Sequence, residues 1–406
     1  MLTKIVRAGL LYALLAAASA AFAQAVPVVF WHSMEAVEET VDRFASEFNA
    51  SQDRFEVQPR YVGDYAEAQT RLIGALGTRD EPALFQAEIG FFPQLVADGA
   101  VQPLSDLAAG VPAEVVRDFY EGAWGYGELE GERYGLPWNL STPVMYLNAD
   151  ALEATGLDVP VSWEAFDETA AALSGRGTRG MAFVGDSWLF EAMVLSLGGD
   201  LVTADGRPNF DSPEALASLE RLKRLQDAGH LAYFSNFEAT PAVLTFVRTR
   251  TNMAFASIAN WPDIFRFSVG FDLVAAPLPT AENGRVPYGG AQLVVMRNAT
   301  AEERAGAFAF WRFLTEPEQL KAWVEASYYI PVRRSVVPLL DDFYAEEPGR
   351  AAALSQLESA VPRPRVPQFN GWRRLIDEAM ESVLKGRQSP EDALAAAQAA
   401  ALEDLP

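Results

Sequence analysis

The sequence contains no cysteine and only two histidines, His32 and His230, among its 406 residues. Without cysteine the chain can form no disulfide, thiolate metal site or thiol nucleophile. The two histidines are far apart, and neither belongs to an HExxH pattern, which argues against a metal site. A Ser–His–Asp triad is also disfavoured, because no G-x-S-x-G stretch is present. The sequence therefore predicts a protein that is not an enzyme and that binds no metal or other cofactor.

Basic residues are scarce as well: 32 lysines and arginines stand against 55 aspartates and glutamates, a formal net charge of −23. Such a surface repels nucleic acid and anionic lipid. A site for an anionic ligand would have to supply its own local positive potential. Individual arginines and clusters of backbone amides are therefore informative.

The first 23 residues have the features of a cleaved signal peptide. Lys4 and Arg7 precede an apolar stretch over residues 10–21, and Ala21-Phe22-Ala23 fits a small-x-small cleavage site. The apolar stretch is too short to span a bilayer. We therefore expect export to the periplasm of a Gram-negative bacterium. Removal of this segment leaves 30 basic and 55 acidic residues, a net charge of −25.

Strand-like and helical patterns alternate along the rest of the chain, which is long enough for two domains. Strands are expected over residues 28–31, 55–60, 83–89, 253–257 and 271–276, and helices over residues 35–49, 65–76, 90–98, 163–173 and 213–228. This alternation favours mainly parallel sheets covered by helices on both faces. Ligands bind such sheets beyond the carboxyl ends of the strands, where His32, Tyr65 and Glu88 would fall.

Three extended segments predict crossings between two α/β lobes, at residues 134–146, at the stretch leading into 288–296, and at 328–331. Lobe 1 is expected to comprise residues 24–140 and 285–327, and lobe 2 residues 141–284 and 328–406. Thr300 with Glu303 predicts a capping box, and Ser389-Pro390 predicts the start of a final helix. An exported two-lobed chain with hinge crossings has the organisation of a solute-binding protein.

Tyr288 to Met296 is the segment around which we expect the site to form. Gly289 and Gly290 expose backbone amides that no Cβ shields, and an apolar strand follows them. A plain bulge or tight turn is the alternative interpretation of the two glycines.

Several polar residues could serve as donors to an anion. The guanidinium of Arg373 suits bidentate binding of phosphate or carboxylate, although it could equally be a surface arginine paired with Asp377. Ser141 and Ser257 offer hydroxyls, although serines at such points are more often turn or cap residues. Together with the Gly290 amide they could stabilise an oxyanion.

Other residues suit a polyol. Glu88 could accept bonds from hydroxyl groups, or could be a solvated loop acid. Aromatic side chains could form stacking walls around a glycerol or sugar, although at least half of them are expected in the core. The aromatic candidates are Tyr65, Trp138, Trp188, Tyr328 and Tyr329.

The sequence resembles the periplasmic sn-glycerol-3-phosphate-binding proteins of ABC importers. The matching motifs, in collinear order over essentially the whole mature chain, are Phe30-Trp31-His32-Ser33-Met34, Tyr61-Val62-Gly63-Asp64-Tyr65, Ser141-Thr142-Pro143-Val144, Gly289-Gly290-Ala291, Tyr329-Ile330-Pro331 and Asp377-Glu378-x-x-Glu381-Ser382-Val383. The resemblance implies the type II periplasmic binding-protein fold of the maltodextrin-binding class, acting as a monomer. It also implies delivery of the ligand to an ABC permease and ATPase complex in the inner membrane.

The resemblance also implies a set of ligand-binding residues. They are Tyr65, Glu88, Ser141, Ser257, Gly290, Tyr329 and Arg373. In one respect the chain departs from the family, because Ile258-Ala259-Asn260 replaces a Ser-Gly-Ser sequence after Ser257. This change could reshape the phosphate pocket, so a glycerophosphodiester such as glycerophosphocholine competes with sn-glycerol-3-phosphate. Trp188 would then supply a cation–π wall for the choline group. The alternatives are a binding protein for a neutral di- or oligosaccharide and, with less support, an exported phosphodiesterase.

Overall fold

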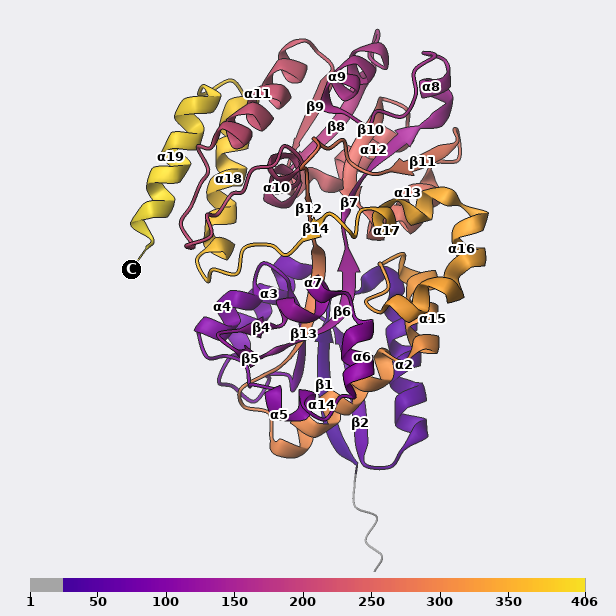
Figure 1. The fold of residues 1–406 in the computed structure, drawn as a ribbon, viewed down its shortest axis with the longest axis vertical. Helices are drawn as coiled ribbons and strands as arrows, with labels where there is room; N and C mark the ends of the chain where they lie inside the picture. The colour runs from indigo at the N-terminus through magenta and orange to yellow at the C-terminus, as the bar shows by residue number, and fades with distance from the viewer. Residues whose placement is uncertain (1–24, 406) are drawn as a thin grey trace, which may run out of the picture.

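The computed structural model describes residues 25–405, and the expected signal peptide lies outside them. The structure has two lobes, each built on a five-stranded sheet (Figure 1). The first sheet has the order β2-β1-β3-β13-β6, and its strands are β1 Val26–His32, β2 Phe55–Tyr61, β3 Leu84–Glu88, β6 Gly135–Ser141 and β13 Gly289–Val295. The second has the order β11-β7-β10-β8-β9, and its strands are β7 Pro143–Asn148, β8 Arg179–Gly185, β9 Leu231–Ser235, β10 Thr251–Ser257 and β11 Leu273–Ala276.

In each sheet one strand runs against the others. β1 pairs in parallel with β2 and β3, whereas β13 is antiparallel to both β3 and β6. In the second sheet β8 pairs in parallel with β9 and β10, whereas β7 is antiparallel to both β10 and β11. The opposed strands are the ones that the chain enters on crossing from the other lobe. The prediction of an α/β two-lobe fold with mainly parallel sheets is confirmed.

Helices surround both sheets. Those of the first lobe are α2 Glu38–Ser51, α3 Tyr65–Ala75, α4 Phe92–Ala97, α5 Ser105–Ala108, α6 Ala113–Asp118, α7 Glu121–Tyr126, α14 Ala301–Leu314 and α15 Pro317–Ser327, with a small hairpin of β4 Glu128–Leu129 and β5 Glu132–Arg133. Those near the second sheet are α8 Ala149–Glu153, α9 Trp163–Ala172, α10 Ser187–Ser196, α11 Pro213–Asp227, α12 Ala239–Val247, α13 Trp261–Phe267, α17 Ala352–Ser355, α18 Phe369–Leu384 and α19 Pro390–Glu403. Among the described helices, none combines the length and the apolar character needed to cross a bilayer.

Two expected helix starts are confirmed. Thr300 Oγ1 accepts a hydrogen bond from the Glu303 amide at 3.2 Å, and Glu303 Oε2 accepts one from the Thr300 amide at 2.7 Å. These are the two reciprocal bonds of a capping box at the start of α14. Ser389 caps α19 by accepting a bond from the Asp392 amide, with Pro390 as the first helical residue.

The lobes are joined by three connections. β6 continues into β7 through Thr142, and β12 Val286–Pro287 leads into β13. β12 pairs in parallel with β14 Ala360–Val361, and the two short strands lie between the lobes (Figure 1).

The third connection between the lobes lies in the segment that follows α15. Ile330 still pairs with Leu140, and Arg333 with Phe119, both against the first lobe. The chain packs on β11 at the short helix η5 Pro348–Ala351, which follows α16 Asp341–Glu346, and again at α17. We therefore propose that the third crossing lies between α16 and η5 rather than at residues 328–331. The exact bounds expected for the two lobes stay a prediction.

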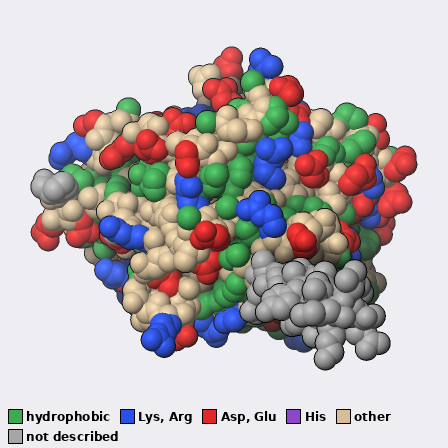
Figure 2. Space-filling model, turned by 90° about the horizontal axis from the view of Figure 1, so that it is seen from below, with side chains coloured by type: hydrophobic (Ala, Val, Ile, Leu, Met, Phe, Trp, Pro, Cys, Tyr) green, Lys and Arg blue, Asp and Glu red, His purple; other side chains and the backbone are tan. Residues whose placement is uncertain are grey.

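The surface carries charges of both signs. Figure 2 shows acidic and basic side chains interspersed over the end of the molecule that is formed by the first lobe. With 55 acidic residues in the chain, this surface is one that an anionic ligand must approach against the overall field.

Candidate functional site

A cavity of about 410 Å³ lies between the two lobes. Eight of the residues expected at the site line it: Tyr65, Glu88, Ser141, Trp188, Ser257, Gly290, Tyr329 and Arg373. The structure thus brings together side chains from β3, α3, β6, α10, β10, β13 and α18. The remaining lining residues are Asp64, Ala66, Asp186, Asn236, Ala259, Asn260, Gly289 and Arg363. That these residues bind a ligand stays a prediction.

Tyr65 is held in the cleft by a chain of polar contacts. It is the first residue of α3, where the Asp64 side chain caps the helix by accepting a bond from the Glu67 amide. Its hydroxyl accepts a bond from Asn139 Nδ2 at 3.0 Å, and Asn139 Oδ1 accepts one from Gln86 Nε2 at 3.0 Å. Burial raises the pKa of Tyr65 well above its ordinary value, and neighbouring Tyr329 adds to this rise. Tyr65 therefore presents a neutral hydroxyl.

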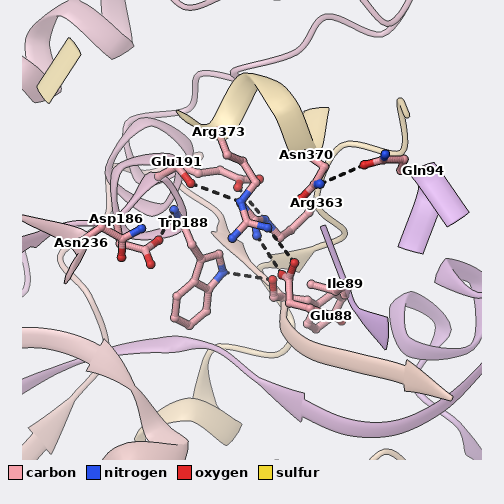
Figure 3. Close-up of polar contacts among 12 residues, drawn as sticks. Glu88, Ile89, Gln94, Asp186, Trp188, Glu191, Asn236, Arg363, Asn370 and Arg373 are labelled. Atoms are coloured by element: carbon pink, nitrogen blue, oxygen red, sulfur yellow. Dashed lines mark hydrogen bonds and ion pairs between the residues drawn. The ribbon is translucent and has the colours of Figure 1, made fainter. Parts of the chain in front are cut away.

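Glu88 and Arg373 form an ion pair that spans the two lobes. Glu88 ends β3 of the first lobe, and Arg373 lies on α18 of the second. Arg373 Nη1 donates to Glu88 Oε2 at 2.7 Å (Figure 3). Burial opposes ionisation of Glu88, but Arg373 and Arg363 outweigh it and hold the pKa of the carboxyl below its usual range. Both alternatives considered from the sequence are wrong for these two side chains: Glu88 is not a solvated loop acid, and Arg373 pairs with Glu88 rather than with Asp377.

Arg363 is a cleft residue that the sequence analysis missed. Its side chain is buried, donating from Nε to Glu191 Oε2 at 2.8 Å and from Nη1 to Glu88 Oε1 at 3.2 Å (Figure 3). Glu191, on α10, is buried as well. The available signal was the run Pro362-Arg363-Pro364-Arg365, in which alternate prolines stiffen an extended segment. Such a segment could hold the side chain of an arginine at a fixed position in the cleft.

A missing side chain at position 90 makes room for these cations. A Cβ built on Gly90 would lie 2.9 Å from Arg373 Nη1 and 3.1 Å from Arg363 Nη1. Glycine at this position therefore lets both guanidinium groups approach Glu88 from the same side.

The two glycines at the start of β13 allow equally close approaches. Gly290 has φ +103°, and a Cβ there would lie 2.1 Å from the Asn139 carbonyl oxygen. A Cβ on Gly289 would lie 2.6 Å from the Trp188 ring and 2.7 Å from Ser141 Oγ. A register shift follows at Ala291, so the bulge considered from the sequence is present next to the glycines. The glycines are needed both for the bulge and for the packing of the cleft wall.

The other expected residues have local roles too. Trp188 Nε1 donates to the Tyr288 carbonyl at 3.1 Å, which fixes the indole ring at the edge of the cleft (Figure 3). Ser257 Oγ accepts a bond from the Ala259 amide and so caps the short helix η3 Ile258–Asn260. Its interpretation as a cap residue is therefore correct, and it still lines the cleft.

Three residues expected at the site lie elsewhere. Trp138 is buried in the core of the first lobe, where its ring stacks on that of Trp323. Tyr328 packs against Trp261 and Phe343. His32 is buried in the first lobe, where its ring lies near those of Phe30 and Tyr61, and burial lowers its pKa to about 4. Among the described residues, no group of three or more His, Asp or Glu side chains could hold a metal ion.

Known proteins resemble this chain in sequence and in fold. The model of the family "Bacterial extracellular solute-binding protein" matches residues 43–352. The sn-glycerol-3-phosphate-binding periplasmic protein UgpB of Escherichia coli K12 is 29% identical over 401 residues, which cover 92% of this chain and 91% of that protein.

Solved structures with the same fold bind different ligands. UgpB from Mycobacterium tuberculosis in complex with glycerophosphocholine superposes with a TM-score of 0.84 at 23% identity, covering 93% of this chain and 98% of that one. The acarbose receptor GacH of Streptomyces glaucescens superposes with a TM-score of 0.82 at 23% identity, covering 94% and 100%. At these identities the likeness extends to the fold only.

Proposed function

Because the chain belongs to the bacterial extracellular solute-binding proteins, we propose that it captures a phosphoglycerol compound, sn-glycerol-3-phosphate or a glycerophosphodiester such as glycerophosphocholine. It is a periplasmic binding protein of an ABC transporter rather than an enzyme. Its partners are a small-molecule ligand and the membrane complex of that transporter. The observation that carries the proposal is the convergence of eight of the expected residues, from both lobes, on one interlobe cleft.

The two lobes contribute different chemistry to the cleft. Arg373 of the second lobe, with the hydroxyls of Ser141 and Ser257, can donate to phosphate oxygens. Glu88 and Tyr65 of the first lobe can bond the hydroxyls of glycerol. A ligand held by groups of both lobes makes all of these contacts only when the cleft is closed, so binding favours the closed state.

The charges that line the cleft favour a ligand that carries a cation as well as a phosphate. The lining contains the carboxylates Asp64, Glu88 and Asp186 and the guanidinium groups of Arg363 and Arg373, three negative against two positive groups. A phosphomonoester would bring up to two further negative charges, whereas glycerophosphocholine is a zwitterion. Asp64 is exposed at the N-cap of α3, which leaves Glu88 and Asp186 against the two guanidinium groups. Because this lining has no excess of positive charge to balance a dianion, it supports the diester over the monoester.

A neutral sugar is the second candidate. Arg373 is already neutralised by Glu88, and such a pair can donate to and accept from sugar hydroxyls. Structures of the same fold in complex with acarbose or maltose also fit this alternative.

Isothermal titration of the purified protein with glycerophosphocholine, sn-glycerol-3-phosphate and maltose tests the proposal. We expect saturable binding of a phosphoglycerol with Kd on the order of micromolar or below, about −8 kcal/mol. Arg373→Ala should weaken this binding by about 2 kcal/mol or more, because a buried charged partner of the phosphate is lost.

The matched control is Arg374→Ala. Arg374 is exposed and pairs with Glu378 on the outer face of α18, so its removal should leave the affinity unchanged. Binding of maltose but of neither phosphoglycerol, or equal effects of the two substitutions, would reject the proposal.

A further inference from the structure

A second cavity opens from the interlobe cleft into the second lobe. It has a volume of about 190 Å³ and lies between the second sheet and the helices α12 and α13. It adjoins the cleft, because five residues line both cavities: Asp186, Trp188, Asn236, Ser257 and Asn260. We call this cavity the side compartment.

Small residues on one face of the second sheet create the side compartment. Ala254 and Ala256 of β10 and Ala182 of β8 line it. On the opposite face of these strands, Met181 and Met253 are large and fully buried. β10 is the central strand of its sheet, yet Ala254 and Ala256 remain partly exposed. Since alternate residues of a strand point to opposite faces, alanine at these positions leaves a hollow that larger side chains would fill.

The lining selects against anions. Among the described residues, Asp186 is the only ionisable side chain that lines the side compartment, and most of the other lining residues are apolar. Asp186 is oriented by its own helix, since its Oδ1 accepts a bond from the Trp188 amide at 2.6 Å. Behind it lies the carboxyl of Asp377, which is close enough to Asp186 for the two groups to repel each other.

The same wall suits an alkylated cation. Trp188 stands at the mouth shared with the cleft, with its indole fixed by the bond to the Tyr288 carbonyl. An aromatic face, a carboxylate and apolar walls together are the features that bind quaternary ammonium groups. Ser257 and Asn260 also line both cavities, so the side compartment meets the cleft on the side of the second lobe.

We propose that the side compartment receives the alkylated ammonium head group of a glycerophosphodiester whose phosphate lies in the cleft. This inference rests on the proposed function and deepens it, because it names the part of the molecule that separates diesters from monoesters. A phosphomonoester leaves the side compartment without an occupant, and a primary ammonium gains less from its apolar walls than a trimethylated one.

The test is to fill the side compartment with a larger side chain and to measure the affinity for three probes: glycerophosphocholine, glycerophosphoethanolamine and sn-glycerol-3-phosphate. For the wild-type protein we expect the affinity to fall in that order. Ala254→Leu should lower the ratio of the glycerophosphocholine affinity to the sn-glycerol-3-phosphate affinity by about tenfold or more, a change within the range of a desolvated cation–π contact.

A control and a second variant guard against misfolding. Ala232→Leu adds the same side chain on β9, directly beside Ala182, but outside the lining of the side compartment, and should keep the wild-type ratio. Asp186→Asn keeps a side-chain oxygen for the cap of α10 and should lower the ratio by removing the negative charge.

The outcomes separate the two proposals. If the protein binds both phosphoglycerols and neither Ala254→Leu nor Asp186→Asn changes the ratio, the head group lies elsewhere and the inference is wrong, while the proposed function stands. If the protein binds sn-glycerol-3-phosphate but not glycerophosphocholine, the inference is again wrong and the proposed function again stands. If neither compound binds, the proposed function itself fails.

Discussion

At the scale of single residues, the buried carboxyl of Asp377 gives the protein a defined pH response. Burial, followed by repulsion from Asp186, raises its pKa from 3.8 to about 7, against the opposing attraction of Arg373. The folded state therefore keeps a proton that the unfolded chain releases. The free energy of unfolding therefore falls as the pH rises from about 4 to about 7. Above about pH 7 the stabilising contribution of the protonated Asp377 carboxyl is lost.

Asp377→Asn should remove this contribution. The variant should gain stability over the wild type at pH 8, and the difference should shrink toward pH 5, because wild-type Asp377 is mostly protonated there. Urea unfolding of both proteins at the two pH values measures this difference and cancels the titration of the other groups. A difference of the same size at both pH values would show that Asp377 does not titrate in this range.

The cleft residues differ in how far their sequence revealed them. Tyr65, Glu88 and Arg373 were found from motifs and strand ends, and they lie in one cavity. Arg363 was missed because nothing local distinguishes a buried arginine from an exposed one. Its burial depends on Glu191 and Glu88, which are 172 and 275 residues away in the sequence.

At the scale of elements, α14 is a helix whose start was predicted from a local motif and which packs behind the site. The helix packs on β1, β2 and β13, the last of which carries Gly289 and Gly290 into the cleft. Thr300→Ala should lower the free energy of unfolding by about 1 kcal/mol, because the Glu303 amide loses its partner. Ligand affinity should not change.

The control for this substitution is Thr70→Ala. Thr70 lies within α3, where its hydroxyl only bonds back to the Ala66 carbonyl, so the change should stay within about 0.5 kcal/mol. Denaturant titration of both variants makes the comparison. Equal effects would mean that the capping box adds nothing to stability.

Other elements could not be recognised from the sequence pattern. Residues 187–196 of α10 are buried almost throughout, so they lack the apolar stripe by which an amphipathic helix is recognised. The paired strands β12 and β14 are only two residues long, too short for any alternation of apolar and polar residues.

At the scale of the whole molecule, ligand binding and stability should be coupled. Because the ligand binds the folded two-lobed protein and not the unfolded chain, a phosphoglycerol at 100 times its Kd should add about 2.7 kcal/mol to the free energy of unfolding. Thermal unfolding with and without ligand measures this as a rise in Tm. At the same ligand concentration Arg373→Ala, whose binding is weaker by about 2 kcal/mol, should gain only about 1 kcal/mol and show a correspondingly smaller rise in Tm. An equal rise would contradict the role given to Arg373.

The sequence by itself determined the features that depend on neighbouring residues. The strand and helix periods, the capping box of Thr300 and Glu303 and the exclusion of thiol chemistry are all local or compositional, and so the sequence alone predicts them. The order of the motifs along the chain also indicated a two-lobed binding protein.

Only the tertiary structure decided which charges meet and where space remains. Glu88 and Arg373 are 285 residues apart and form one ion pair across the cleft. The side compartment exists because alanines of separate strands face the same helix. Contacts between distant segments and the volume left between them depend on how whole elements pack, and no local pattern of residues encodes either.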